Sequence, residues 1–397
     1  MTRALLVDIV RSPFGRGRPG GVLSALHPVD LFAQVLQGLM ARVAIDPVLV
    51  EDVIAGCVLQ VGEQAANIAR HAWLAAGLPE STPGVSLDRK CGSAQQAIDF
   101  AAQGVIAGAY DVVVAGGVEM MSRIAMKSNR LGRDSHGPMF HQRYRDGLVH
   151  QGIAAELIAA RWRLDRERLD AYALRSHQRA AAAEDRGALG RQIVPVSVPG
   201  ADGSRMTVDA DEGIRRDTSA QRLAQLAPAF RDDGVSRRFP EIGWRVTAGN
   251  ASPVTDGACA ALICSEAAAV RLGLTPRAAI TRFAVVGDDP VMMLTGVIPA
   301  TRKLLGRAGL AIGDIDAFEV NEAFASVVLA WQQELDADPD RVNSDGGAIA
   351  FGHPVGASGG RLMASLLGTL DARRGRYGLQ TMCESGGMAN ATLVERL

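Results

Sequence analysis

The sequence predicts an α/β protein built from two related halves, with a different kind of segment inserted between them. Strand-like and helix-like segments alternate through residues 1–120 and again from about residue 275 to the end, which is the pattern of α/β folds. Residues 121–250 are instead rich in charge and in loops that contain Pro, Gly and Arg. A chain of 397 residues is long enough for two or three domains.

Composition places the chain among ordinary globular proteins and excludes several classes of partner. The formal net charge is −1, so no global field attracts nucleic acid or an anionic membrane surface. The N-terminus lacks the apolar core of a signal peptide, and no run of about 18 apolar residues occurs. The five cysteines show neither a disulfide framework nor a metal-ligand pattern such as C-x-x-C. We therefore expect a cytoplasmic protein with free thiols, no bound metal and no membrane span.

The first part of the chain contains recognisable elements in order. An apolar strand covers residues 4–10, helical periodicity starts near residue 28, and residues 42–56 form a helix end, a short turn and an apolar strand. From Ala94 onward, apolar residues recur at i, i+3, i+4, i+7, i+8, i+11 and i+12. This spacing predicts an amphipathic helix with one buried stripe, ended by Gly108.

Two segments of the first part resemble two segments of the last part. Residues 42–56 align with 307–321 at an offset of 265, and residues 109–121 parallel 376–388 at an offset of 267. The first pair shares the order helix end, short turn and apolar strand, and the second pair shares the order helix exit, strand and Gly-rich turn. We interpret the similarity as two related α/β halves, and chance similarity of generic α/β segments is the alternative. The inserted segment has its own helical stretches, at 152–163 and 166–186.

One cysteine stands where a reactive thiol is expected. Cys91, in the stretch DRKC, follows Arg89 and Lys90 and lies just before the helix that begins near Ala94. Unpaired N–H groups and the positive end of the dipole at a helix N-terminus favour an anion. We therefore expect the pKa of this thiol to lie below its usual value of about 8.5, which favours the attacking thiolate. A capping or core cysteine is the alternative interpretation.

Three further stretches carry chemistry-bearing residues. His353 lies in a Gly-rich turn before a helix (FGHPVGASGG), where an imidazole can act as a base or a donor. Cys383 ends a strand before a tight turn (TMCESGGMAN), and Asn321-Glu322 follow an apolar strand (FEVNEAFAS), a common position for site residues in α/β proteins. The remaining cysteines lie in apolar runs and are expected in the core: Cys57, Cys259 and Cys264.

Taken together, these motifs resemble the thiolase family of acetyl-CoA acyltransferases and acetyltransferases, over essentially the whole chain. The segment VTAGNASPVTDGA matches the family's segment beside the pantetheine of coenzyme A. The resemblance implies two five-stranded βαβαβαββ halves in a five-layer αβαβα arrangement with an inserted loop domain. The implied divisions are a first half over residues 1–120, completed by about 250–272, a loop domain covering CoA over 121–249, and a second half over 273–397.

The resemblance also implies a mechanism, in which CoA is a substrate and no cofactor is permanently bound. Cys91, deprotonated with help from His353, attacks the ketone of a 3-oxoacyl-CoA, and Cys383 protonates the departing acetyl-CoA enolate. A second CoA then takes the acyl group, and the reverse direction is a Claisen condensation. The implied oxyanion donors are His353 with a water held by Asn321, and the backbone N–H groups of Cys91 and Ser385. The motifs resemble bacterial degradative thiolases, of fatty-acid β-oxidation or of steroid side chains.

The family pattern maps further residues onto CoA. It places Ser252 and Ala248 near the pantetheine, His150 at the mouth of the channel and Arg215 at the nucleotide end. A solvated charge run is the alternative for Arg215. Two aromatic residues are expected to wall the tunnel: Phe230 and Phe324. Homodimers or homotetramers are also implied, with a tetramer contact expected around residues 124–142.

Some positions depart from the family pattern C-x-G-G-G-x-G and from its usual Ser-Gly after the first cysteine. Ser385 and Ala389 replace two glycines, and Ala94 follows Ser93 where a glycine is usual. Extra sequence at 236–245 precedes VTAGN and is expected to reshape the acyl pocket. Two other functions stay open at this point: a decarboxylating condensing enzyme of the ketoacyl-synthase kind, which lacks a second catalytic cysteine, and a non-catalytic CoA or lipid carrier.

Overall fold

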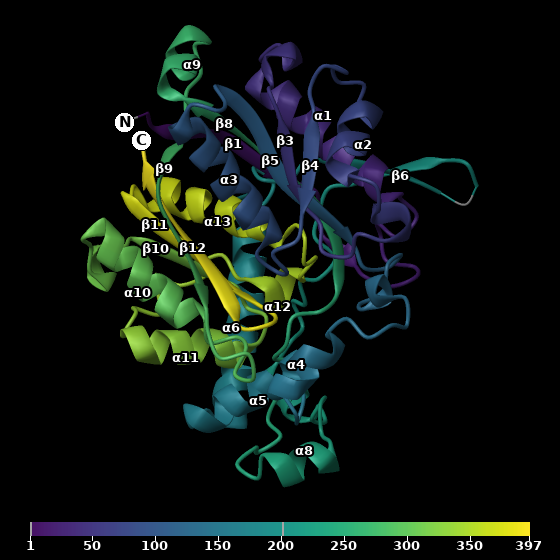
Figure 1. The fold of residues 1–397 in the computed structure, drawn as a ribbon, viewed down its shortest axis with the longest axis vertical. Coiled ribbons are helices and arrows are strands. Elements are labelled where there is room, and N and C mark those ends of the chain that lie inside the picture. Colours follow the sequence, from purple (N-terminus) through teal and green to yellow (C-terminus); the bar gives the residue numbers. More distant parts are fainter. Residues whose placement is uncertain (1, 201) are drawn as a thin grey trace.

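The computed structural model describes residues 2–200 and 202–397, and its main strands form one continuous, twisted sheet (Figure 1). The strand order is β10-β11-β12-β9-β1-β8-β5-β3-β4, and the short β2 (Gly15–Arg16) pairs with β8 off this path. The first half supplies β1 (Ala4–Arg11), β3 (Val53–Gly56), β4 (Gly84–Leu87), β5 (Val112–Met120) and β8 (Thr255–Ser265). The second half supplies β9 (Ala278–Gly287), β10 (Ala317–Val320), β11 (Tyr377–Glu384) and β12 (Met388–Arg396).

The two halves repeat the same mixture of parallel and antiparallel pairing. In the first half β4, β3 and β5 are parallel, and β8 and β1 are antiparallel to their neighbours. In the second half β10 and β11 are parallel, and β12 and β9 follow antiparallel. The halves join where β1 pairs with β9 over Ala4–Leu6.

Helices cover both faces of each half and produce the expected five layers. On the outer face of the first half lie α1 (Pro28–Val43) and α2 (Ile68–Ala75), and on that of the second half lie α10 (Val297–Ala308) and α11 (Ala325–Leu335). Between the halves lie α3 (Ser93–Ala107) and α13 (Ser358–Arg373), which pack against each other and against strands of both halves. The amphipathic helix predicted from Ala94 to Gly108 is α3, and Gly108 is its left-handed C-cap.

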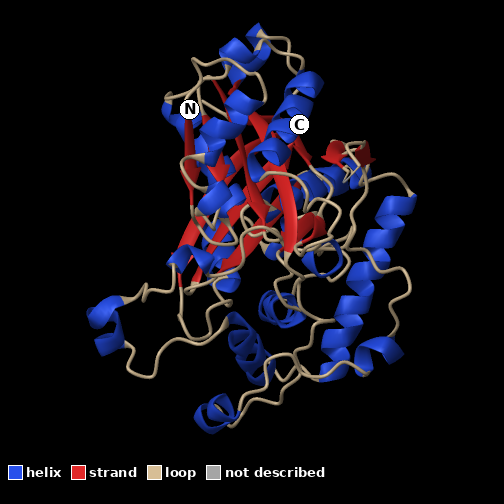
Figure 2. Cartoon of the chain, turned by 90° about the vertical axis from the view of Figure 1, so that its right-hand side faces the viewer, coloured by secondary structure: helices blue, strands red, loops and turns tan. Residues whose placement is uncertain are grey.

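Both chain termini lie at one end of the strands (Figures 1 and 2). The helices at residues 137–161 and 233–238 of the inserted segment lie beyond the other end, whereas the two short strands of this segment, at residues 196–199 and 205–208, pack beside α1 of the first half. The elements of the inserted segment are α4 (Gly137–Arg143), α5 (Gln151–Arg161), α6 (Arg166–Asp185), β6 (Val196–Pro199), β7 (Arg205–Val208), α7 (Ala220–Ala224) and α8 (Asp233–Arg238). Helices α5 and α6 pack against α11, and α6 also packs against the short α12 (Ala348–Phe351). A buried ion pair between Arg11 and Asp211, 2.7 Å apart, fastens the segment to β1. The short α9 (Glu266–Arg271) follows β8.

A single shift in residue number relates the two halves, and it is the offset of 265 found for the first pair of segments. It superposes the first residues of α3 and α13 (Ser93 and Ser358) and of β5 and β11 (Val112 and Tyr377). In the sheet, Val53 of β3 lies opposite Val114 and Ala317 of β10 lies opposite Gly378. Both pairs span the same length of chain, so one shift must hold for both strands.

The alignment of 109–121 with 376–388 at an offset of 267 is therefore wrong by two positions. It matched the glycines of the two segments, but these glycines have different positions in the fold. Gly116 and Gly117 lie inside β5, whereas Gly386 and Gly387 form the turn after β11. The duplication itself is supported by the register.

The second half also differs from the expected five strands. Where the first half has β4, the second half has one parallel bridge between Phe318 and Val342. The next residue, Asn343, donates its backbone N–H to Phe318 O at 2.9 Å but bonds Val320 through its side chain: Oδ1 accepts from Val320 N–H at 2.8 Å, and Nδ2 donates to Val320 O at 2.9 Å. Since these bonds occupy the Val320 groups, the ladder ends there.

Candidate active site

The four candidate catalytic residues predicted from the sequence lie at the ends of four different segments. Cys91 lies two residues before α3, Asn321 directly follows β10, and Cys383 is the next-to-last residue of β11. His353 lies in the turn between α12 and α13. Cys383 and Asn321 are fully buried, His353 is 6% exposed, and Cys91 is half-buried.

Asn321 is the residue around which the others meet. Its Nδ2 lies 3.5 Å from Nε2 of His353, and its amide is close enough to the Cys383 thiol to offset part of the rise that burial causes in the pKa of that thiol. Cys383 is in turn close enough to Cys91 for its charge to raise the pKa of that thiol. The structure thus brings together four residues that are far apart in the chain.

Hydrogen bonds fix the tautomer of His353. Ser358 Oγ donates to Pro354 O at 2.9 Å, so it must accept from Nδ1–H of His353, 2.6 Å away. Nε2 therefore carries the free lone pair and faces Asn321. Burial, and secondarily the charge of Arg361, lower the pKa of His353 to about 4. The imidazole is neutral near pH 7 and is oriented as a base.

The expectation of a lowered pKa for Cys91 is wrong. Burial raises the pKa of this thiol well above its ordinary value, and the nearby Cys383 and Glu384 raise it further. The helix end contributes little because its N–H groups are engaged: Gly92 N–H donates to Arg89 O at 3.1 Å, and Ser93 N–H donates to Lys90 O at 3.0 Å. The resting thiol is therefore protonated, and its ionisation requires a base.

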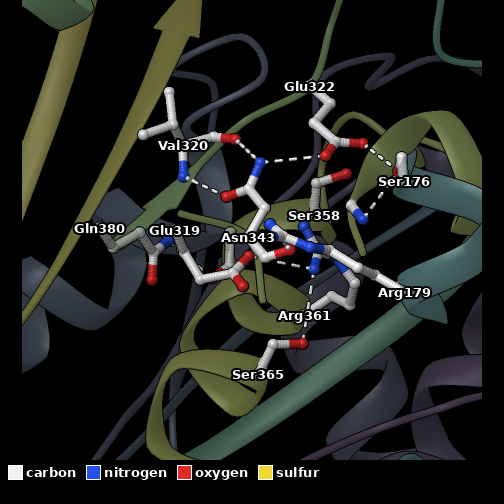
Figure 3. Close-up of polar contacts among 12 residues, drawn as sticks. Ser176, Arg179, Glu319, Val320, Glu322, Asn343, Ser358, Arg361, Ser365 and Gln380 are labelled. Carbon is white, nitrogen blue, oxygen red and sulfur yellow. Dashed lines mark hydrogen bonds and ion pairs between the residues drawn. The ribbon is translucent and has the colours of Figure 1, made fainter. Parts of the chain in front are cut away.

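Two polar clusters surround the end of β10, the strand that precedes Asn321 (Figure 3). Glu322 accepts hydrogen bonds from Tyr172 at 2.8 Å, Ser176 at 2.7 Å and Asn343 at 3.1 Å, which fixes the chain just after Asn321. On α13, the buried Arg361 lies 3.2 Å from Glu319.

The Gly-rich turn after Cys383 accommodates its departures from the family pattern. Gly386 and Gly387 have φ values of 97° and 78°, and the described non-glycine residues with positive φ do not include Ser385 or Ala389. Ala389 lies in β12 opposite Cys383. The serine and the alanine therefore occupy positions that any L-residue can adopt.

An aromatic row leads from the surface to the buried site. The rings of His150 and Phe230 are 5.4 Å apart, and those of Phe230 and Phe324 are 6.0 Å apart. His150 is exposed and Phe324 is buried. Ser252 lies beside this row, with its Oγ donating to Ala323 O at 3.1 Å.

A cavity of about 320 Å³ adjoins this row. His150 and Phe230 line it together with apolar residues of the inserted segment, among them Ile153, Val235 and Phe239. The extra sequence at 236–245 therefore does contribute to a pocket wall.

Two other residues expected at CoA are exposed. Ala248 lies at the surface, in the loop that precedes β8. Arg215 is also exposed, and its backbone N–H donates to Nδ1 of His177 on α6 at 3.2 Å.

The chain matches two family models, described as thiolase, N-terminal domain, over residues 4–267 and thiolase, C-terminal domain, over residues 274–396. The chain belongs to the thiolase family. It is 47% identical over 405 residues to a steroid 3-ketoacyl-CoA thiolase of Mycobacterium tuberculosis, covering 100% of this chain and 95% of that protein. It is 41% identical over 415 residues to a 3-oxoadipyl-CoA/3-oxo-5,6-dehydrosuberyl-CoA thiolase of Escherichia coli, covering 100% of both.

A solved structure supports the same assignment. The crystal structure of the Bacillus anthracis acetyl-CoA acetyltransferase has a TM-score of 0.89 and 38% identity, covering 100% of this chain and 99% of that chain. The protein is thus an enzyme, an acyltransferase with thiolase function and the thiolase fold. Among the described residues, no helix has both the length and the apolar character needed to cross a membrane.

Sequence reasoning missed several polar residues of this thiolase. Glu119, Glu319 and Glu384 are buried carboxyl groups near the ends of strands. Each of them is visible in the sequence as a single acidic residue within an apolar strand. Such a residue is unusual unless its side chain is hydrogen-bonded or has a function. A different group, Asp134, His136 and His141, brings three exposed potential metal ligands within 4.8 Å of one another in the inserted segment.

Proposed function

We propose that this thiolase cleaves a 3-oxoacyl-CoA with CoA through an acyl group carried on Cys91. The observation that carries the proposal is the meeting of Cys91, Cys383 and His353 around Asn321. Nucleophilic catalysis divides the carbon–carbon cleavage into two easier steps. Since the steps are reversible, the same site also supports the Claisen condensation.

In the first half-reaction, Nε2 of His353 takes the thiol proton as the Cys91 sulfur attacks the 3-oxo carbon. The bond between C2 and C3 then breaks, leaving the acyl group on Cys91 and the electron pair on C2 of acetyl-CoA. Cys383, fully buried and protonated, gives its proton to that carbon. Burial raises the pKa of Cys383 to about 12, so this thiol is a proton carrier matched to a weakly acidic carbon acid.

In the second half-reaction, the Cys383 thiolate takes the proton of the incoming CoA thiol. The CoA sulfur attacks the acyl thioester, and Cys91 leaves and recovers its proton from the His353 imidazolium. The enzyme returns to its starting state and one acyl-CoA is released. The developing oxyanions require donors, for which we propose His353 with a water held by Asn321, and the backbone N–H groups of Cys91 and Ser385.

For CoA, we propose that Ser252, Ala248 and the aromatic row of His150, Phe230 and Phe324 line the pantetheine channel, with Arg215 at the nucleotide end. CoA acts as a substrate, with no permanently bound cofactor. The apolar cavity beside the row favours a large acyl group in a degradative reaction. Steroid and oxoadipyl acyl groups appear in the names of two relatives, which makes both suitable members of a test panel.

We propose that the protein works as a homodimer or homotetramer in the cytoplasm. β4 is an edge strand of the sheet, and Val85 on it is 45% exposed, as is Phe100 on α3 at 44%. An open edge with apolar side chains is usually covered by a partner. All five cysteines are free, in keeping with a reducing compartment.

The test is a panel of 3-oxoacyl-CoA substrates of increasing size, incubated with CoA. We expect acetyl-CoA and a shortened acyl-CoA, and an acyl adduct on Cys91 in the intact mass of the enzyme. Activity with malonyl but not acetyl thioesters would indicate the condensing enzyme instead. No adduct and no turnover across the panel would favour a carrier and reject the proposal.

A further inference from the structure

A third titratable side chain lies directly beside the two reactive thiols. Glu384 follows Cys383 in β11, and its carboxyl group points toward the start of α3. Oε1 of Glu384 occupies the space that a β-carbon on Gly92 would need, so the carboxyl group contacts the residue after Cys91. Glu384 is fully buried. The reaction steps described above do not use it.

The equivalent position in the first half holds a carboxyl group with a structural role, which can be compared with Glu384. The shift that relates the halves superposes Glu384 on Glu119, which stands at the end of β5 beside Gly356, at the start of α13. Glu119 accepts hydrogen bonds from the backbone N–H groups of Val58 at 2.9 Å and Leu59 at 3.2 Å, and from Gln64 at 2.6 Å. These hydrogen bonds to Glu119 hold the loop after β3 in place.

Glu384 has no comparable partners. Among the described residues, neither of its carboxyl oxygens has a hydrogen-bond partner. The neighbouring Asn390 donates its Nδ2 hydrogen to Gly92 O at 3.2 Å rather than to the carboxyl group. A buried carboxyl group without donors is destabilised in its charged form and persists as the neutral acid.

The charges facing Glu384 come from the loop before α3 and from α3 itself. Arg89, in the loop before α3, favours its ionised form, while Asp88 in the same loop and Asp99 on α3 oppose it. Burial outweighs all of these and raises the pKa of Glu384 to about 8. The influence is mutual, because the Glu384 charge raises the pKa values of both Cys91 and Cys383.

We propose that Glu384 is a positioning residue of the thiolase reaction, whose carboxyl group must stay neutral for Cys91 and Cys383 to form their thiolates. As a neutral acid it fills the space against Gly92 without repelling a negative sulfur. As pH rises through the pKa of the carboxyl group, the carboxylate forms and its charge opposes the thiolate. The inference rests on the proposed role of Cys91 as nucleophile.

The test measures the ionisation of Cys91 without turnover. The rate of alkylation of Cys91 by iodoacetamide, an uncharged reagent, is followed by peptide mass spectrometry from pH 6 to 10, in the wild type and in Glu384→Gln. Glutamine has the shape of the neutral acid but cannot ionise. We expect the two proteins to be alkylated at equal rates near pH 6, where the Glu384 carboxyl group is neutral. Above pH 8, where the wild type carries the carboxylate, we expect the variant to be alkylated up to about tenfold faster, which corresponds to a Cys91 pKa lower by about one unit.

Asp99→Asn is the matched control. Asp99 is a second buried carboxyl group, with its pKa also raised to about 8. It lies on α3, six residues after the helix begins and therefore about 9 Å further along the helix axis. We expect no gain in alkylation rate from this variant, because removing the Asp99 charge favours the Glu384 carboxylate and so cannot favour the Cys91 thiolate.

A profile of Glu384→Gln that superimposes on those of the wild type and Asp99→Asn, or that moves to higher pH, would overturn the proposal. If Glu384→Gln does not fold, Cys383→Ala serves instead, because it leaves one thiol beside Glu384. Its alkylation rate should rise by clearly less than tenfold per pH unit between pH 7 and 9, and a full tenfold slope would count against the proposal. Failure of the proposed function is seen separately, as a wild type that forms no acyl adduct.

Discussion

The two halves of this thiolase share one topology, yet each proposed catalytic position is filled in only one of them. With the shift that relates the halves, Cys91 before α3 corresponds to Gly356 before α13. Two equivalent serines then begin these helices, but Ser358 holds His353, whereas Ser93 accepts from Arg89 N–H at 2.8 Å and donates to Lys90 O at 2.6 Å.

The strand ends show the same asymmetry. Asn321 corresponds to Gly56, and a β-carbon at Gly56 would lie 2.6 Å from the backbone nitrogen of Ala94. Cys383 corresponds to Val118, a buried core residue. The first half uses these positions for close packing, and in the second half they hold the residues for which we propose a chemical role. The comparison teaches that the fold offers two related sets of positions but only one complete site, formed from pieces of both halves.

The largest expected effect of a substitution is at Cys91, which has no reactive counterpart in the other half. We expect Cys91→Ala to lower kcat by at least about a thousandfold and to remove the acyl adduct, because no other group replaces the nucleophile. Steady-state kinetics and intact mass spectrometry measure both effects. The control is Cys264→Ala in the apolar core of β8, which should retain activity. Adduct formation by Cys91→Ala would show that another residue is the nucleophile.

The equivalent serines provide the next test. Ser358→Ala removes the acceptor that fixes Nδ1–H of His353, so we expect kcat/KM to fall about ten- to hundredfold. Ser93→Ala should chiefly lower the stability of the turn before α3, by about 1 kcal/mol. Kinetics and thermal unfolding of both variants separate the two roles. Equal losses of activity would mean that the serines are not functionally distinct.

In the turn after Cys383 we expect a smaller difference, between a substitution at a glycine with positive φ and one at a serine without it. Gly387→Ala is strained, because φ is 78° and the new β-carbon would lie 2.7 Å from Asp288 O, at a cost of about 1–3 kcal/mol. Ser385→Gly restores the family pattern where no positive φ requires it, and should change kcat less than about threefold. Denaturant unfolding and kinetics test the pair. A large gain in activity from Ser385→Gly would show that the serine restricts the turn.

The smallest expected effect is in the acid limb of the pH profile. His353 must be neutral to accept a proton, and its pKa is lowered to about 4. Activity should therefore be lost only as pH falls through about 4, and kcat/KM should stay nearly constant between pH 7 and 5.5. An inflection near 6.5, the ordinary value for histidine, would contradict the geometry described for this imidazole.

Much of this molecule could be predicted from its sequence, because the main signals are local. Alternating strand and helix patterns indicated two α/β halves, and the motifs around Cys91, Asn321, His353 and Cys383 indicated one site. The raised pKa of Cys91 could not be predicted, because burial depends on residues distant in the chain. The shortened edge at Val342 depends on side-chain bonds of Asn343, and periodicity contains no information on such bonds.

The continuity of the sheet has a consequence for folding during synthesis on the ribosome. β1 is the first strand to be made, yet its sheet neighbours are β8 and β9. The rest of the first half and the whole inserted segment must emerge before β8 (Thr255–Ser265) can lie between β1 and β5. Pairing between strands so far apart in the chain slows folding. We therefore expect β1 of the nascent chain to stay unpaired, and to depend on chaperones, until synthesis of the second half of the enzyme begins.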